Sequence, residues 1–481
     1  MSVRQICRIL GILMLLYSVT LLPPMLLSLW LDDGGITAFS VALIEIVALG
    51  MLAWWPNRHQ RDELTPRDGF VVVTLFWVVF GTIGAFPFLL SPHHALPFVD
   101  ALFESFSGLT GTGSSVMADL DNIPPSLNYY RHQLCWLGGM GIVVLAIAIM
   151  PMLGVGGMQL YRAESPGVVK DKLTPRITET AKALWLIYVG LTLLCLLCFR
   201  LASMSWFDAV CHAFSTIATA GFSTHGNSIG HFNSPLIELI TAVFMFAGAI
   251  NFGLHFMALR RGRPIAYWRD PELRFFAGSL LLLIALVSVM LWSSSTLAPL
   301  QALRHGLFMS TSLLTTTGFS STDFTMWPGI LPFLVVSASV MGGMAGSTAS
   351  GVKPLRMMLA LKHSLREISR LLHPNGVFAL RLGRKVVHYR VIDAVWGFLT
   401  LYLGVFVIMM WSVMATGVDF VTAYGAVVCS LNNAGAGLGA VASSYASLND
   451  AAKLILMGGM VLGRLEIFTL LVLLSPAFWR R

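Results

Sequence analysis

The chain has 481 residues, of which 56% are hydrophobic and only 11% charged, and its mean hydropathy is +0.77. Soluble proteins carry about a quarter charged residues, so this composition excludes a water-soluble enzyme and predicts a polytopic membrane protein. Lys and Arg outnumber Asp and Glu by 31 to 23. In a membrane protein such a surplus is expected on the cytoplasmic side, and it does not indicate a nucleic-acid partner.

Apolar runs long enough to cross a bilayer, which takes about 20 helical residues, recur along the whole chain. They cover 9–31, 37–55, 69–91, 132–153, 183–202, 235–259, 276–296, 328–346, 391–416 and 453–475. These runs predict ten spans. Basic residues gather in alternate loops, most densely over 353–390. Because Lys and Arg resist translocation, we expect these loops and both termini to be cytoplasmic.

Four shorter apolar segments lie in the loops on the opposite side, where basic residues are few. They cover 96–113, 206–221, 300–318 and 420–435. Each is too short to cross the membrane, which is typical of re-entrant helices. Backbone that leaves helical geometry at membrane depth is tolerated only when it is buried in protein or lines a watery cavity. The four segments therefore predict a pore.

Each short segment ends in small or polar residues followed by glycine. The four copies are Thr110-Gly111-Thr112-Gly113, Ala218-Thr219-Ala220-Gly221, Thr315-Thr316-Thr317-Gly318 and Asn432-Asn433-Ala434-Gly435. A single such copy is usually a turn or a close helix contact. Four copies at similar spacing, always after a short apolar helix, indicate a repeated unit of span, pore helix, loop and span.

The composition of the four loops suits a site for dehydrated cations. Such a cation must replace its water ligands with protein oxygens, and backbone carbonyls can supply them. To direct successive carbonyls at one axis, the chain must adopt dihedrals that a Cβ forbids, so we expect the closing glycine of each copy to adopt them. Threonine and serine hydroxyls can add further oxygens.

Two features in the C-terminal part of the chain have more than one interpretation. The glycine-, serine- and threonine-rich run at 342–351 does not favour a continuous helix; it is either a close helix contact or an unwound loop beneath the pore. Arg464 lies in the last apolar run, where an unpaired guanidinium is costly, so it either faces the pore or pairs with an acid such as Glu466.

Asp100 and Glu104 near the outer mouth of the predicted pore also allow two interpretations. These carboxylates either concentrate cations or are ordinary solvated charges.

Six stretches carry a resemblance to a known family. They are Phe103-Glu104-Ser105-Phe106-Ser107-Gly108-Leu109-Thr110, Trp136-Leu137-Gly138-Gly139-Met140-Gly141, Gly154-Val155-Gly156-Gly157-Met158-Gln159-Leu160-Tyr161, Gly221-Phe222-Ser223-Thr224-His225, Ala345-Gly346-Ser347-Thr348 and Gly463-Arg464-Leu465-Glu466. On these residues the chain resembles the Trk/Ktr/HKT superfamily of potassium transporters, most closely its Trk-type membrane subunits. The resemblance covers essentially the whole chain.

The resemblance implies an all-α polytopic membrane protein with four membrane–pore-loop–membrane repeats in pseudo-fourfold symmetry and two extra N-terminal transmembrane helices. The expected division is 1–68 for the two extra helices, 69–178, 179–274, 275–390 and 391–481 for repeats one to four, with an intramembrane gating loop in the third. The implied function is potassium uptake across the bacterial inner membrane through a central pore. Proton- or sodium-coupled potassium symport and sodium permeation remain alternatives within the same architecture.

The resemblance also implies specific potassium ligands. They are the carbonyls of Gly111, Thr112, Thr219, Ala220, Thr316, Thr317, Asn433 and Ala434, in loops that begin at Thr110, Ala218, Thr315 and Asn432 and turn at Gly113, Gly221, Gly318 and Gly435. In this superfamily a serine in the first copy accompanies sodium permeation, so Gly113 indicates potassium. Two positions depart from the family pattern: Gly111 replaces the usual threonine, and Ala436 stands where proline commonly follows the glycine.

For the gate, the resemblance implies an intramembrane loop with Arg464 beside it. The loop residues are Gly346, Ser347, Thr348, Ala349, Ser350 and Gly351, of which Ala349 and Ser350 replace glycines common in the family. The implied partners are membrane lipid, a second copy of the chain and a TrkA-like cytoplasmic nucleotide-binding regulatory protein docked on 353–390. The chain lacks a Walker-type phosphate loop, so we expect it to bind no nucleotide itself.

Other functions have weaker support. A membrane enzyme would need convergent acids, bases or metal ligands, but the 12 histidines are scattered and His93-His94 has no matching cluster. Cys195 and Cys198 have redox-motif spacing, but they lie in an apolar run that lacks thiolate-stabilising charge except Arg200, which favours core packing. Coupled transporters of other folds show inverted repeats, whereas these four copies run in the same sense.

Overall fold

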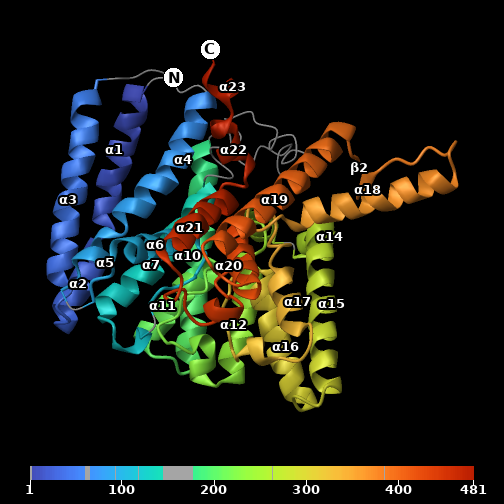
Figure 1. Cartoon of the computed structure of the whole chain (residues 1–481), viewed down its shortest axis with the longest axis horizontal. Coiled ribbons are helices and arrows are strands. Elements are labelled where there is room, and N and C mark those ends of the chain that lie inside the picture. Colours follow the sequence, from blue (N-terminus) through green and yellow to red (C-terminus); the bar gives the residue numbers. More distant parts are fainter. Residues whose placement is uncertain are drawn as a thin grey trace.

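The protein is described by a computed structural model that covers residues 3–59, 66–92, 94–117, 119–144, 177–262, 264–383 and 385–480. The described chain is mostly helical (Figure 1). Among the described residues, the strands are β1 (Arg381–Leu382) and β2 (Lys385–Val386), which pair antiparallel. The predicted all-α class is confirmed apart from this hairpin. His93, the stretch 154–161 and the basic residues of 162–176 lie outside the described residues.

The first three helices lie at one edge of the molecule, where α1 packs along α3 (Figure 1). Their bounds are α1 Val3–Val19, α2 Leu22–Leu31, α3 Ile36–Trp54 and the 3-10 turn η1 Trp55–Asn57. α1 and α3 cross at two glycines: a Cβ on Gly11 would lie 2.8 Å from the carbonyl oxygen of Gly50. Small residues allow such close approach of helices where lipid supplies no hydrophobic driving force between them.

The remaining elements follow one order four times: a longer helix, a short helix, an extended loop and another helix. The first group is α4 Pro66–Ile83, α5 Phe86–Leu90, α6 Phe98–Thr110, η2 Leu120–Asn122 and α7 Pro125–Val144. The second is α10 Ile177–Leu201, α11 Trp206–Ile217, η4 Ser228–Phe232, α12 Pro235–Gly248, α13 Phe252–Arg261 and α14 Ile265–Arg269. The third is α15 Pro271–Ser293, α16 Pro299–Leu314, η5 Phe324–Met326, α17 Leu331–Ala338 and α18 Pro354–Leu372. The fourth is α19 Tyr389–Ala415, α20 Phe420–Asn432, η6 Gly439–Val441, α21 Asp450–Arg464, α22 Phe468–Leu474 and α23 Pro476–Trp479.

Fewer helices cross in one piece than the hydropathy predicts. Within the described residues, six helices are long and apolar enough to span a membrane, and two further spans are bent pairs: α12 with α13, by 94°, and α21 with α22, by 114°. The expectation of ten unbroken spans is therefore wrong for 235–259 and 453–475. It is also wrong for 328–346, which holds only the 8-residue α17. Hydropathy measures composition and cannot detect a break such as Asn251, whose side chain caps α13 by accepting from the amide of Gly253.

The short helices α6, α11, α16 and α20 lie where the half-length apolar segments predict them, and most of their side chains are buried. Longer helices surround them and expose apolar side chains outward, as on α15, where Leu281 is 67% and Leu282 71% exposed. This surface suits lipid rather than water. α18 and the β1–β2 hairpin project from the body, and α23 ends on the same side of the molecule where α1 begins (Figure 1).

Candidate functional site

The four loops leave their short helices through the same hydrogen-bond pattern. In each, the amide of the third loop residue donates to a carbonyl five residues earlier. The bonds are Thr112 to Ser107 at 2.9 Å, Ala220 to Ser215 at 2.9 Å, Thr317 to Ser312 at 2.8 Å and Ala434 to Cys429 at 2.8 Å. This is the six-to-one bond of a Schellman cap. It terminates all four helices alike, so the loops begin with matched geometry.

The second residue of each loop is left-handed, as this cap requires. The φ angles are +71° at Gly111, +51° at Thr219, +57° at Thr316 and +52° at Asn433. Gly111 adopts this conformation freely, whereas residues with a Cβ are strained there. The departure at Gly111 therefore places glycine where the backbone favours it. A Cβ at Gly111 would still have room, because its nearest neighbours lie 3.7 Å away.

The four closing glycines adjoin one another in a closed ring. A Cβ on Gly113 would lie 2.5 Å from the amide nitrogen of Gly221, and one on Gly221 would lie 2.8 Å from the carbonyl carbon of Gly318. A Cβ on Gly318 would lie 2.7 Å from Cα of Gly435, and one on Gly435 would lie 2.8 Å from the carbonyl oxygen of Gly113. Each missing side chain thus leaves the space that the next loop's backbone occupies.

The reason for glycine differs around the ring. The expected dihedral is present at Gly113, with φ +80°, and at Gly318, with φ +86°. The prediction of such a dihedral is wrong for Gly221 and Gly435, which do not have positive φ. At those two positions glycine is needed because of the close approach of the neighbouring loop, since real Cβ atoms do not come within 3.0 Å of such atoms.

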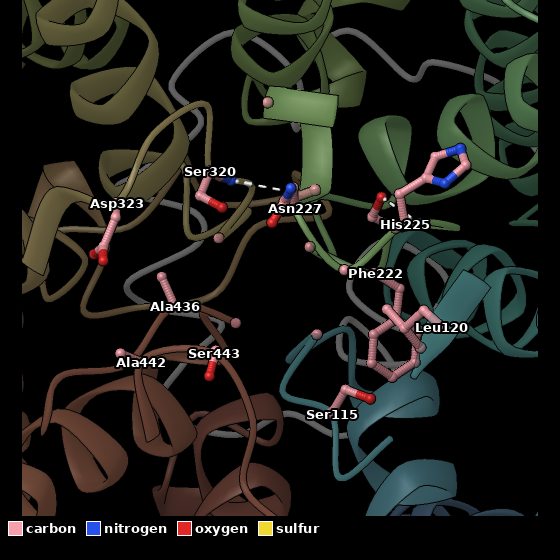
Figure 2. A pocket seen from close by; sticks show the side chains of 18 of the residues that line it. Ser115, Leu120, Phe222, His225, Asn227, Ser320, Asp323, Ala436, Ala442 and Ser443 are labelled. Atoms are coloured by element: carbon pink, nitrogen blue, oxygen red, sulfur yellow. Dashed lines mark hydrogen bonds between the residues drawn. The ribbon is translucent and has the colours of Figure 1, made fainter. Parts of the chain in front are cut away.

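A cavity of about 480 Å³ opens on one side of the ring. All four closing glycines line it, together with residues that follow them in the four loops, and Figure 2 shows the four segments meeting around it. Two of its walls are joined directly, because the amide of Ser320 donates to Ser228 Oγ over 3.2 Å. The cavity is therefore a mouth shared by all four loops, and we call it the mouth pocket.

A buried ion pair stabilises two walls of the mouth pocket. Arg131 Nε donates to Glu104 Oε1 at 2.7 Å, and both side chains are fully buried. Glu104 also accepts from the amide of Val116, beyond the first loop. The Arg131 guanidinium lies 4.3 Å from the ring centroid of Phe222, next to the second closing glycine. Arg131 is not among the site residues predicted from the sequence, because nothing in the pattern indicates its distant partner.

The two mouth carboxylates are therefore not free charges. Glu104 is neutralised by Arg131, and Asp100 Oδ1 lies 2.5 Å from Nζ of Lys453. Both expected roles, concentrating cations and ordinary solvation, are wrong for Glu104, whose side chain is fully buried. Paired carboxylates contribute little net field at a distance.

The loop 342–351 lies against the residues that precede the closing glycines, on the side of the ring away from the mouth pocket. Thr348 Oγ1 donates to the last carbonyl of α11, that of Ile217, at 2.9 Å, and accepts from Thr219 Oγ1 at 3.2 Å. The amide of Ser350 donates to Thr316 Oγ1 at 3.1 Å. The loop is unwound and touches the second and third glycine loops, so the alternative of a simple helix contact is wrong.

The break between α12 and α13 holds the other edge of this loop. The amide of Met344 donates to the carbonyl of Ala249 at 2.9 Å, and the amide of Phe252 donates to the carbonyl of Gly346 at 3.0 Å. The backbone groups that the bend frees are therefore satisfied by the loop, as buried backbone requires.

Arg464 ends α21 and is tied to the loop. Its Nη1 donates to the carbonyl of Thr348 at 2.8 Å and to Ser350 Oγ at 3.3 Å, while Nη2 donates to the carbonyl of Gly138 at 3.1 Å. The expected alternative, a pair with Glu466, is wrong, because Glu466 Oε2 instead lies 2.5 Å from Arg356 Nη2. Arg464 therefore bears a buried charge held by neutral acceptors.

The structure also brings together a histidine cluster that the sequence does not predict. His225 Nδ1 lies 2.6 Å from Asp121 Oδ1, and the rings of His225 and His231 are stacked with centroids 3.5 Å apart. The hydrogen bond with His225 holds the pKa of Asp121 below its usual value. Because Asp121 follows the first loop and both histidines follow the second, only folding makes them neighbours.

Comparison with known proteins agrees with this architecture. Residues 35–481 match the TrkH family, described as cation transport proteins. The Trk system potassium uptake protein TrkH of Halomonas elongata is 52% identical over 482 residues, and that of Escherichia coli K12 is 48% identical over 483 residues; each alignment covers 100% of both chains. TrkG of Escherichia coli K12 is 39% identical and covers 99% of each chain.

A solved structure matches along the full length. The crystal structure of the potassium transporter TrkH from Vibrio parahaemolyticus is 46% identical and superposes with a TM-score of 0.93, covering 100% of each chain. All these relatives are named as transport proteins, which confirms the sequence-based conclusion that the chain is not an enzyme. On residues 35–481, the chain belongs to the TrkH family of cation transport proteins.

Proposed function

We propose that this membrane protein takes up potassium across the bacterial inner membrane through the ring of four loops. The observation that carries the proposal is the closed ring of Gly113, Gly221, Gly318 and Gly435, in which each loop's backbone adjoins the next. At the four closing glycines no side chain separates one loop from the next, so the ring is walled by main chain there. The relatives named as potassium uptake proteins support potassium as the cation.

The short helices supply the electrostatics. Each of α6, α11, α16 and α20 ends directly at its loop, and a helix C-terminus carries about half a negative elementary charge. Four such ends stabilise a cation without a titratable group. The proposed ligands are the carbonyls of Gly111, Thr112, Thr219, Ala220, Thr316, Thr317, Asn433 and Ala434, with the residues Thr110, Ala218, Thr315 and Asn432 preceding them. A hydrogen bond of 2.9 Å from Asn433 Nδ2 to Thr112 Oγ1 joins the fourth loop to the first.

Flux through purified protein in liposomes tests the proposal. With a potassium gradient as the driving force, we expect potassium and rubidium to enter the liposomes much faster than sodium through the wild-type protein. Gly226→Ala should behave in the same way, because a Cβ at this position has nothing within 4 Å. Gly221→Ala, whose Cβ would lie 2.5 Å from the carbonyl oxygen of Thr317, should lose this flux. Equal flux in the two variants would contradict the proposed pathway. Repeating the measurement with and without a pH or sodium gradient distinguishes a channel from coupled symport.

We propose that Gly346, Ser347, Thr348, Ala349, Ser350 and Gly351 form the gate. The contacts of Thr348 with the second loop and of Ser350 with the third support this role. Arg464 adds a positive charge beside the loop, which opposes cation passage. Deleting 347–350 should increase flux, and the matched control is a four-residue deletion in the projecting turn at 374–377. Flux no larger than wild type from a correctly folded deletion variant would exclude the gate.

We further propose that both termini and residues 353–390 face the cytoplasm, where a TrkA-like nucleotide-binding protein docks and regulates the gate. The projecting α18 supports this, because it begins directly after the loop and carries a stripe of exposed apolar side chains. These are Leu361, Leu365, Ile368 and Leu372, between 52% and 72% exposed. A homodimer in lipid is part of the proposal, and the mass of the purified particle tests it.

The recurring element order supports the proposed division into 1–68, 69–178, 179–274, 275–390 and 391–481. We place the first segment outside the repeats, because the four closing glycines that adjoin one another all lie in the later segments. Each later segment has one Schellman-capped short helix.

A further inference from the structure

Three side chains that can bind metal ions meet beside the mouth pocket, and they come from two of its walls. Asp121 lies in η2, after the first loop, whereas His225 and His231 follow the second loop. One ligand atom from each lies within 4.8 Å of those of the other two. The His225 imidazole points away from the middle of the pocket (Figure 2), so the proposed potassium pathway does not use it.

We propose that Asp121, His225 and His231 bind a divalent transition-metal ion of the Zn²⁺ type, which slows potassium uptake while bound. Two imidazoles and a carboxylate, with water as the fourth ligand, form a tetrahedral set that suits Zn²⁺. Bonds of about 2.0–2.2 Å place such ligands roughly 3.4 Å apart. His225 Nδ1 and Asp121 Oδ1, now 2.6 Å apart, must therefore separate slightly, while the His231 ligand atom, within 4.8 Å of the other two, must approach them. The two rings must also tilt out of their parallel stack, so that their nitrogen lone pairs converge on the ion.

The surroundings favour a cation at this position. His225 Nδ1 and Asp121 Oδ1, 2.6 Å apart, now share a proton, which the metal ion replaces. Asp208 Oδ1 lies 3.4 Å from His225 Nε2, on the side of the ring from which carboxylates orient metal-bound imidazoles. The Asp121 side chain is 56% exposed and that of His225 20%, so an ion can reach the cluster from solvent.

The position of the ion explains its effect on uptake. Leu120, next to Asp121, lines the mouth pocket together with His225. A bound ion therefore links the first wall of the mouth to the second and adds positive charge at the rim, which lowers the local concentration of arriving cations. The inhibition rests on the proposed potassium pathway, whereas the binding does not.

Metal binding is measured on the full-length protein in detergent, by calorimetry with Zn²⁺ and by visible absorption with Co²⁺. We expect His231→Ala and Asp121→Asn each to weaken Zn²⁺ binding by at least about tenfold, because even partners outside the ligand set contribute about 10–100-fold. The matched control, His94→Ala in the loop before α6, should bind as wild type does. His231→Gln keeps a side chain of similar size and serves if the alanine variant does not fold.

Equal Zn²⁺ affinity in wild type and the folded His231 and Asp121 variants would overturn the site. For the effect on uptake, Zn²⁺ added on the mouth side of liposomes should lower rubidium uptake by wild type but not by His231→Ala. Inhibition that persists in His231→Ala, or binding without inhibition, would overturn the inhibitory role. If rubidium uptake is missing even without Zn²⁺, the proposed function fails, while calorimetry still decides the site.

Discussion

Replacing Gly113 with serine tests the ring where the first loop meets the second. Gly113 has φ +80°, where an L side chain costs about 1–2 kcal/mol. Its new Cβ would lie 2.5 Å from the amide nitrogen of Gly221 and 2.9 Å from its Cα, so the second loop must move away by several tenths of an ångström or more. That movement separates the first two sets of carbonyls and adds a hydroxyl oxygen between them.

If the strain of about 1–2 kcal/mol appears as lost discrimination between cations, the potassium-to-sodium permeability ratio falls by about 5–30-fold. Reversal potentials in planar bilayers with potassium on one side and sodium on the other measure this ratio. Gly226→Ser is the matched control, because it adds the same side chain beside the same mouth pocket with nothing within 4 Å. A Gly113→Ser protein with the wild-type ratio would refute the role of Gly113 in selectivity.

Three further substitutions test separate parts of the site. Arg464→Gln should raise flux about tenfold or more, because the loop 342–351 then loses the charge-assisted hydrogen bonds that hold it, such as that from Arg464 to Thr348. Such bonds are worth about 1.5–3 kcal/mol each. Unchanged rubidium flux would argue for a purely structural arginine. Glu104→Gln should destabilise the protein by about 3–5 kcal/mol, because it leaves Arg131 buried without its partner, and an unchanged melting temperature in detergent would contradict this. Gly111→Asn should retain uptake, since its Cβ has 3.7 Å of clearance and asparagine tolerates the left-handed region; loss of rubidium uptake in a folded variant would show that the position needs glycine.

The broken spans mark one limit of reasoning from composition. Hydropathy correctly places the short helices α6, α11, α16 and α20, because an apolar run ending in a polar glycine motif is a local feature. It treats 453–475 as one span, although the chain bends by 114° after Arg464. The bend depends on what Arg464 and the following residues contact, and those partners, such as Thr348, are remote in sequence.

The sequence by itself determined the membrane class, the short helices, the four glycine loops and the family resemblance, because periodicity, composition and motif spacing are properties of neighbouring residues. Only the tertiary structure decided that Gly221 and Gly435 are required by close approach, that Glu104 is neutralised by Arg131, and that Asp121 lies beside two histidines. The physical reason is that these features arise where backbone or charge from one segment meets another that is remote in the sequence. In a packed interior, space and desolvation leave few arrangements for such contacts.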